Sequence, residues 1–498
     1  MPKTLPIFYS ALLLTGVNLL LRLVGTSFQV YLSGRIGAEG IGLLQLVMSV
    51  GGLATVAGMA GIRTGAMYLT AEELGRKRPG QVRWVLSGCF LYSICFSGSV
   101  AVLLYTFAPQ IAVHWIGDTR TVAALRLFAG FLPVTCLCGI LCGYFTAANR
   151  IGTLAAVEVA EQLCSMTGTM GLLTLWAGTD PVRACQCVIL GNSAGILFTL
   201  GCLMILRFRE RSSIGERIPV RQRLVKTAVP LAAADVLKSG INTTENLMVP
   251  KRLALNTLVE NPLASFGVVS GMVFPILMFP ACILFGLAEL LIPELARCAA
   301  ASSQTRIRYL VKRSLKVAML YGLLFGGLMV LLAEPLCLKL YKSPEAGDFL
   351  KLYALLVPML YCDALTDAMT KGLGQQTACV RYNILTSAMD VVFLYFLLPK
   401  YGMEGYFLSF LITHLVNFLL SFRRLLTIAE IKIPFYIPAL SLTAAMMAVM
   451  GASMISGNAG QCLAYTGILG SLLYLCRIIG QEDFQWIFGL MGAKKRPA

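Results

Sequence analysis

A few charged and polar side chains lie inside long apolar stretches, and these are the residues whose types and spacing could do chemistry. Asn18, Arg22, Thr26 and Gln29 are spaced so that they fall along one face of a helix. A guanidinium in apolar surroundings attracts an anion, and its planar fork holds two oxygens of a group such as pyrophosphate. We predict that this face lines a cavity that binds an anionic group. The alternatives are that Arg22 extends toward water or pairs with a nearby acid.

A second polar face lies in a later, less apolar stretch. Asp235, Lys238, Asn242 and Glu245 again share one side of a helix. We predict that they line the same cavity, and the alternative is that Asp235 and Lys238 neutralise each other as a local pair. Arg63 stands at the end of another apolar stretch. It is expected at the mouth of the cavity, where it either attracts an anionic headgroup or anchors its helix.

Two pairs of carboxylates have the spacing of neighbours on a helix. Glu158 and Glu161 lie one turn apart, and so do Asp363 and Asp367. Close carboxylates raise one another's pKa, so each pair is a candidate for coupling to a cation or a proton. The alternative for the two glutamates is packing against polar residues of the same lobe.

Other reactive side chains are interpreted as structural. Asp390 and Arg381 are read as a charge pair, and His414 as a packing residue rather than a proton shuttle. Most of the 16 Cys lie in apolar stretches, where Cys acts as a small hydrophobe. The sequence predicts no disulfide framework, no metal site and no cofactor.

These side chains must be positioned by membrane helices. The 498 residues are 57% hydrophobic and 13% charged, against about 25% charged in a soluble domain. About 20 apolar residues of helix cross a bilayer, and the runs lack the alternation of a barrel. We predict an all-α polytopic membrane protein, whose first helix is retained rather than cleaved. The fourteen predicted spans are 5–32, 40–62, 84–107, 124–147, 152–176, 184–206, 227–248, 264–290, 314–333, 349–370, 377–398, 405–422, 436–456 and 461–480.

The orientation of the spans follows from the positions of the basic residues. With a cytoplasmic N-terminus, 28 of the 41 Lys and Arg residues fall on the cytoplasmic side and 10 on the outside. We predict a multi-pass protein of a bacterial cell membrane with both termini in the cytoplasm. The net charge of +17 is explained by this topology, and no nucleic-acid partner is expected.

The chain contains an internal repeat. At an offset of 225 residues, the segment 125–133 matches 350–358 in a Leu-basic-Leu…Pro pattern, and Gly42 meets Gly267. Six spans per repeat predict a parallel repeat around a central cavity. The predicted parts are an N-lobe at 1–206, a basic linker at 207–226, a C-lobe at 227–425, and two extra helices with a cytoplasmic tail at 426–498. Pro133, Pro358, Pro275 and Pro280 are predicted to kink their spans.

Short loops and the absence of a phosphate-binding loop pattern disfavour an enzyme and ATP hydrolysis. Three hypotheses remain. The first is a flippase for a lipid-linked saccharide, working by alternating access. The second is a cation-coupled multidrug antiporter, which Arg22 disfavours because like charges repel more strongly at low dielectric. The third is a membrane glycosyltransferase or ligase, which normally needs a larger outer loop.

Four short motifs carry a family resemblance. They are Arg22-Leu23-Val24-Gly25, the Gly-rich turn at 37–42, the segment Leu291-Ile292-Pro293-Glu294-Leu295-Ala296, and the turn at 400–405. In this order the sequence resembles the multidrug/oligosaccharidyl-lipid/polysaccharide exporter superfamily over essentially its whole length. The polysaccharide-exporter branch is the most similar.

The resemblance implies a function and a site. It implies translocation of an undecaprenyl-pyrophosphate-linked saccharide to the outer leaflet, as a precursor of cell wall, spore-cortex peptidoglycan or polysaccharide. The implied partners are the lipid-linked saccharide, the bilayer and cell-wall synthesis enzymes. Related lipid II flippases carry an essential arginine in an Arg-x-x-Gly segment, and Arg22 matches it. Phe28 stands near the point where those flippases carry a further arginine, so their full cationic cluster is not reproduced here.

Overall fold

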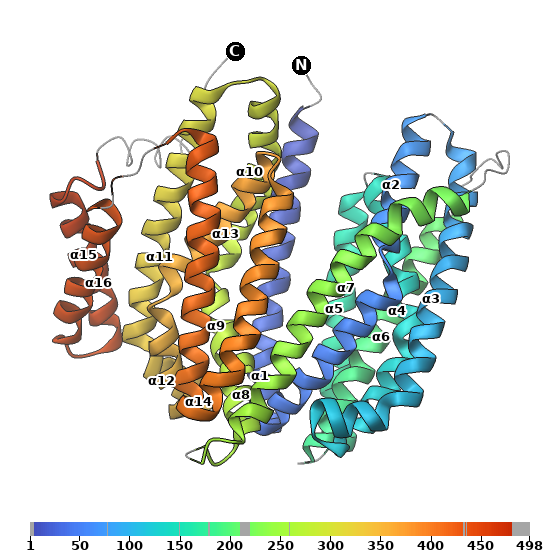
Figure 1. Cartoon of the computed structure of the whole chain (residues 1–498), viewed down its shortest axis with the longest axis horizontal. Helices are drawn as coiled ribbons and strands as arrows, with labels where there is room; N and C mark the ends of the chain where they lie inside the picture. The colour runs from blue at the N-terminus through green and yellow to red at the C-terminus, as the bar shows by residue number, and fades with distance from the viewer. Residues whose placement is uncertain are drawn as a thin grey trace. The chain divides into compact units, whose positions relative to one another are not determined.

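The structure is a computed structural model, and the part of the chain that it describes is helical. It describes residues 4–76, 78–148, 150–177, 180–209, 220–257, 259–431, 434 and 436–480, and no strand occurs among them. Half of the predicted basic linker (210–219) and the predicted cytoplasmic tail lie outside these residues, and so does the side chain of Asn18. Figure 1 shows the order of the helices.

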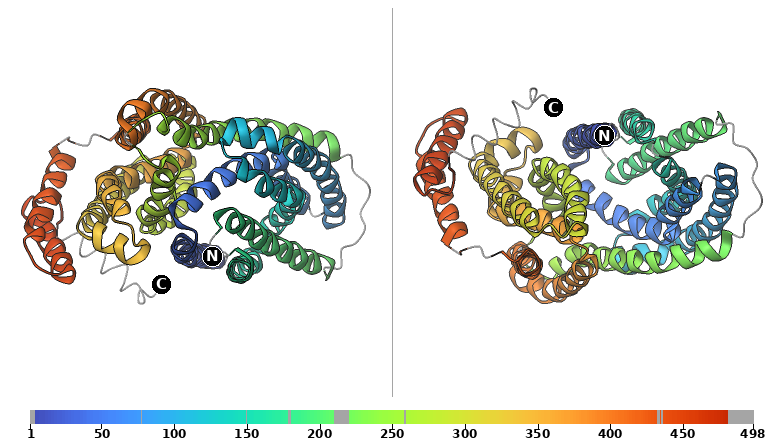
Figure 2. Two further views of the ribbon diagram at one scale, coloured as in Figure 1. Left: turned by 90° about the horizontal axis from the view of Figure 1, so that it is seen from below. Right: turned by 90° about the horizontal axis from the view of Figure 1, so that it is seen from above.

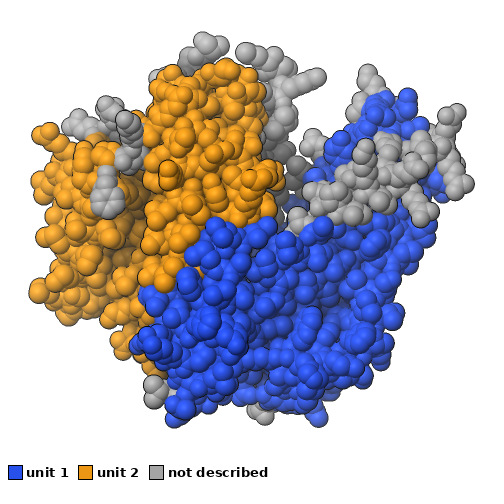
Figure 3. Space-filling view, in the orientation of Figure 1, with its two compact units in different colours: residues 1–279, 384–410 blue, residues 280–383, 411–498 orange. Residues whose placement is uncertain are grey.

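The chain divides into two compact units, which Figure 3 distinguishes by colour. Unit 1 comprises residues 1–279 and 384–410, and unit 2 comprises 280–383 and 411–498. These divisions do not coincide with the predicted lobes, whose boundaries stay a prediction.

Unit 1 holds the longest helix of the first half of the chain. This helix, α1, bends at Gly37, where φ is 69°, a left-handed value that suits glycine. Three π-helical turns interrupt later helices, as π-turns often do near functional sites. The elements of unit 1 are α1 (Thr4–Met59), α2 (Ile62–Gly75), α3 (Val82–Gln110), η2 (Ile111–Ile116), α4 (Val122–Ala147), α5 (Ile151–Leu172), η4 (Leu173–Ala177), α6 (Pro181–Arg209), α7 (Val220–Leu253), α8 (Pro262–Val268), η5 (Val269–Val273), α9 (Phe274–Met278) and the middle of α14 (Gln376–Ala429).

Unit 2 is built around α11. Its other elements are α10 (Ala281–Ala300), α11 (Gln304–Tyr341), α12 (Pro344–Ala354), α13 (Val357–Gly372), both ends of α14, α15 (Tyr436–Ser453) and α16 (Asn458–Leu475). The hairpin α15–α16, red in Figure 2, packs on α11 through an apolar core. Tyr465 is fully buried there, and its hydroxyl donates a hydrogen bond to the Leu323 carbonyl oxygen at 2.6 Å. Gly327 makes room for this ring, because a Cβ there would lie 2.1 Å from Tyr465 Oη.

The predicted fold class is confirmed. Helix covers most of each of the fourteen predicted spans, although the spans at 264–290 and 349–370 are broken. Among the described residues seven helices are long and apolar enough to cross a membrane, or nine when each pair separated by a short break counts as one. Two of the seven each cover two predicted spans, which a kink divides at Gly37 in α1 and at Gly402 in α14. The chain is therefore a multi-pass, all-α membrane protein.

The predicted proline kinks differ in outcome. Pro275 begins α9 and Pro280 precedes α10, so span eight is broken as expected. Pro358 begins α13 after a break from α12. Pro133, its partner in the repeat, lies inside the continuous helix α4.

Candidate functional site

Arg22 lies in the half of α1 that precedes the kink, and its side chain is exposed. The adjoining backbone is held by α5, because Gln162 Nε2 donates a hydrogen bond to the Leu21 carbonyl oxygen at 2.9 Å. Gly25 permits this approach, since a Cβ there would lie 3.2 Å from Gln162 Nε2. The turn that carries Arg22 is thus fixed against α5.

The other described members of the predicted α1 face have structural partners. Thr26 Oγ1 donates to the Arg22 carbonyl oxygen at 2.9 Å, within the helix. Gln29 Nε2 donates to the Gly271 carbonyl oxygen at 3.1 Å, in the π-helical turn η5. A polar side chain of α1 therefore supports the backbone of η5, which sequence periodicity did not predict.

Arg63, near the start of α2, is exposed and packs over two glycines of α4. A Cβ at Gly143 would lie 2.6 Å from the Arg63 carbonyl oxygen, and one at Gly139 would lie 3.9 Å from Arg63 Cβ. The guanidinium interacts electrostatically with Glu158 of α5. No carboxylate among the described residues lies within salt-bridge distance of it. The positive charge of Arg63 therefore interacts with Glu158 without a direct salt bridge.

The predicted carboxylate pair of α5 lies in this same region. Glu158 and Glu161 repel each other, and Glu161 accepts a hydrogen bond from Thr199 Oγ1 of α6 at 2.7 Å. We call Arg63, Glu158, Glu161 and Thr199 the α5 cluster. The structure therefore brings together residues that the sequence predicted as two separate sites, one for the anion and one for coupling.

The predicted α7 face divides in two. Asp235, Lys238 and Asn242 are exposed, and the described residues include no salt bridge between Asp235 and Lys238. Glu245 instead forms a hydrogen bond with the carboxyl group of Asp390 in α14.

Glu245 and Asp390 form an acid pair that sequence reasoning missed. Asp390 is buried and also accepts a hydrogen bond from the Ser409 hydroxyl, while the buried Tyr406 lies close enough to both carboxyl groups to interact with their charges. The expected role of Asp390 as a partner of Arg381 is replaced by this pair. Two hydrogen-bonded carboxyl groups in apolar surroundings do not both ionise unless a cation lies between them. The arrangement can therefore hold a proton or a small cation.

The predicted carboxylates of α13 have partners within unit 2. Asn417 Nδ2 donates to both carboxylate oxygens of Asp363, at 3.1 and 3.4 Å. Asp367 forms a salt bridge with Lys371, with 2.5 Å between Oδ2 and Nζ. These contacts tie Asp367 to its own helix and leave Asp363 with an amide partner.

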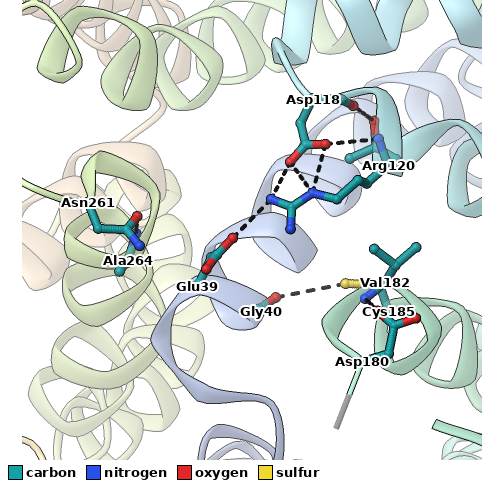
Figure 4. Close-up of polar contacts among 10 residues, drawn as sticks. Glu39, Gly40, Asp118, Arg120, Asp180, Val182, Cys185, Asn261 and Ala264 are labelled. Carbon is teal, nitrogen blue, oxygen red and sulfur yellow. Dashed lines mark hydrogen bonds and ion pairs between the residues drawn. The ribbon is translucent and has the colours of Figure 1, made fainter.

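A polar cluster holds the turn that follows the α1 kink (Figure 4). Arg120 donates to both carboxylate oxygens of Asp118, and its Nη2 lies 2.9 Å from Glu39 Oε1. Cys185 Sγ donates weakly to the Gly40 carbonyl oxygen at 3.8 Å. Although partial burial opposes ionisation, the hydrogen bonds and charge of Arg120 hold the pKa of Asp118 below its ordinary value. The cluster fixes the second half of α1 to α6 and to the connection between α3 and α4.

Comparisons with known proteins agree with this architecture. The MatE family model matches residues 15–166. Stage V sporulation protein B of Bacillus subtilis (strain 168) is 22% identical over 509 residues, which cover 96% of this chain and 96% of that protein.

Two solved structures show the same fold. The lipid II flippase MurJ in an inward closed conformation aligns with a TM-score of 0.68 at 14% identity, over 94% of this chain and all of that one. An inward-facing multidrug resistance MATE transporter of the MOP superfamily aligns with a TM-score of 0.62 at 15% identity, over 84% of this chain and all of that one.

Proposed function

The chain is related to the multidrug/oligosaccharidyl-lipid/polysaccharide exporter superfamily, as its sequence predicts, and from this premise we propose that it is a flippase. Its substrate is an undecaprenyl-pyrophosphate-linked saccharide, a precursor of cell wall, spore-cortex peptidoglycan or polysaccharide. The protein moves this lipid to the outer leaflet of the cell membrane by alternating access, with both termini in the cytoplasm.

One observation carries the proposal: Arg22 is exposed on the polar face of α1, at a turn held by α5. A pyrophosphate accepts two hydrogen bonds from such a planar fork. Arg63, in the same compact unit, supplies a second exposed guanidinium. Asn18 and Thr26, with Asp235, Lys238 and Asn242 of α7, are proposed to contact the headgroup and sugars, while the lipid tail stays in the bilayer.

The acid pair is the proposed coupling site. Glu245 and Asp390 hold one proton or a small cation between them. Uptake and release of this proton or cation change how α7 packs on α14 during the transport cycle. This assignment is supported by the direct carboxyl–carboxyl contact. The carboxylates of α13 are weaker candidates, because Asp367 already has its own salt bridge.

Transport in proteoliposomes tests the proposal. The purified protein is reconstituted with a fluorescent undecaprenyl-pyrophosphate disaccharide, and a membrane-impermeant enzyme that cleaves the saccharide reports which leaflet holds it. We expect wild type to expose the inner-leaflet pool and Arg22→Ala to do so at least tenfold more slowly. Lys238→Gln, on the proposed α7 face, should give a smaller loss.

The second candidate is a cation-coupled multidrug antiporter, which the acid pair and the similarity to MATE transporters favour. The same vesicles separate the two candidates. Proton- or sodium-driven efflux of a cationic dye, with no movement of the saccharide lipid, would support the antiporter and overturn the flippase.

A further inference from the structure

The α5 cluster places two acids beside the arginine that is proposed to meet the substrate anion. Ile62, Cys142 and Val157 are buried in one apolar core, and Arg63 and Glu158 immediately follow Ile62 and Val157 in the chain. The α4 backbone at Gly143 lies against the Arg63 backbone, and Cys142 of the same turn lies close enough to Arg63 and Glu158 to interact with both charges. They lie close enough to interact electrostatically but not to form a direct salt bridge.

Among the described residues, the charges that act on Glu158 are those of Arg63 and Glu161. On α4 the neighbouring groups are the thiols of Cys138 and Cys142, which share a hydrogen bond, and on α6 the Thr199 hydroxyl. On α5 itself Glu161 lies one turn from Glu158, and on α1 the backbone next to Arg22 contacts Gln162. With both acids ionised, Arg63 contributes one positive charge against two negative charges.

We infer that Glu158 is the counter-charge of Arg63, and that the substrate anion binds at Arg63 together with protonation of Glu158. This inference rests on the proposed function, because it assigns Arg63 to the headgroup. An anion that approaches Arg63 meets a cluster with a net negative charge. Uptake of one proton by Glu158 makes the cluster neutral and removes the repulsion.

Glu158 thus sets the affinity of the protein for the substrate anion without contacting the lipid itself. A unit charge within roughly 10 Å in partly buried surroundings changes the binding of another by about tenfold or more. Neutralising Glu158 therefore raises anion affinity through Arg63, whereas removing Arg63 abolishes that gain. Glu161 is less suited to this role because the Thr199 hydroxyl already stabilises its charge.

Calorimetry of the full-length protein in detergent tests this linkage, with undecaprenyl pyrophosphate as the probe. Titrations in two buffers of different ionisation enthalpy give the number of protons taken up on binding. We expect about one proton for wild type and nearly none for Glu158→Gln. Glu158→Gln should bind about tenfold more tightly at pH 8, and the double variant with Arg63→Ala should bind no more tightly than Arg63→Ala alone.

Glu72→Gln is the matched control, since Glu72 is an acid of α2 that pairs with Arg76. It should leave affinity and proton uptake at wild-type values. Unchanged proton uptake in Glu158→Gln would overturn the inference, and so would an affinity gain that persists without Arg63.

A second readout needs no lipid substrate. In Arg63→Cys, the relative rates of labelling by anionic and cationic methanethiosulfonate reagents report the local charge at position 63. Adding Glu158→Gln should shift this ratio several-fold toward the anionic reagent, and no shift would contradict the counter-charge. If wild type fails to bind undecaprenyl pyrophosphate but the ratio shifts, the proposed substrate is wrong while the counter-charge stands.

Discussion

Gly42 of α1 and Gly267 of α8 lie against each other, and they are the same two glycines that the 225-residue repeat superimposes. A Cβ at Gly267 would lie 2.1 Å from the Ala38 carbonyl oxygen and 2.7 Å from the Gly42 nitrogen. A Cβ at Gly42 would lie 2.3 Å from the Leu263 carbonyl oxygen.

Alanine at Gly267 should therefore destabilise the protein. The added methyl group has no space without a backbone shift, and overpacking of this kind costs about 1–3 kcal/mol. Thermal unfolding of the purified protein in detergent measures the loss. Gly52→Ala is the control on α1, because a Cβ there meets nothing within 4 Å. Equal effects of the two substitutions would show that the contact between α1 and α8 is not tight.

The docking of α15–α16 on α11 should depend on Tyr465. Its hydroxyl is buried against the Leu323 carbonyl oxygen, so Tyr465→Phe should lose about 1 kcal/mol of stability. Gly327→Ala should lose more, because its methyl group meets the ring. In a Tyr465→Ala background the cost of Gly327→Ala should shrink, which a double-mutant cycle detects. Additive costs would argue against the contact.

The ion pairs of Arg120 should respond to pH in a defined direction. The folded-state pKa of Asp118 lies below its ordinary value of 3.8. The contribution of Asp118 to stability is therefore fully present above the unfolded-state pKa and is lost as pH falls through the folded-state value. Asp118→Asn should lower the melting temperature slightly at pH 7, and that difference should shrink as pH falls through the folded-state pKa of Asp118. A difference that grows as pH falls would contradict the assignment.

The acid pair should bind the coupling ion. If Glu245 and Asp390 share a proton or cation, the melting temperature of wild type should vary with pH or sodium concentration. Glu245→Gln preserves a hydrogen bond to Asp390 but removes one of the two carboxyl groups that share the proton or cation, so it should flatten that dependence while the protein stays folded. Glu72→Gln, which breaks a salt bridge on α2, serves as the control and should retain the wild-type dependence.

The sequence predicted where the helices lie, but not which side chains of different helices contact one another. Length and hydropathy located the spans, and the turns at Gly37 and Gly402 divide the two long helices as predicted. The pairing of Glu245 with Asp390 joins helices 145 residues apart, and no periodicity along one helix can reveal it. Reading Asp390 as a partner of Arg381 failed because nine residues of helix rise about 13 Å, too far for direct contact.

Helical spacing has the same limit at the polar faces, because it describes one helix at a time. Helical spacing placed Arg22, Thr26 and Gln29 on one side of α1, but it could not show that Gln29 supports the π-turn of η5. The sequence also predicted Arg63 and the carboxylates of α5 as separate sites, because they lie far apart along the chain. Packing of α2 and α5 against α4 unites Arg63 with Glu158.

Native mass spectrometry of the purified protein with undecaprenyl-pyrophosphate disaccharide shows whether the protein binds this lipid through Arg22. We predict selective binding over bulk phospholipid, weakened in Arg22→Ala by about 1.5–3 kcal/mol, the usual loss for a charged hydrogen bond. Arg22→Lys should retain part of the affinity, because it keeps the charge without the planar fork. Binding that is equal in wild type and Arg22→Ala, or no stronger than that of phosphatidylglycerol, would contradict the account.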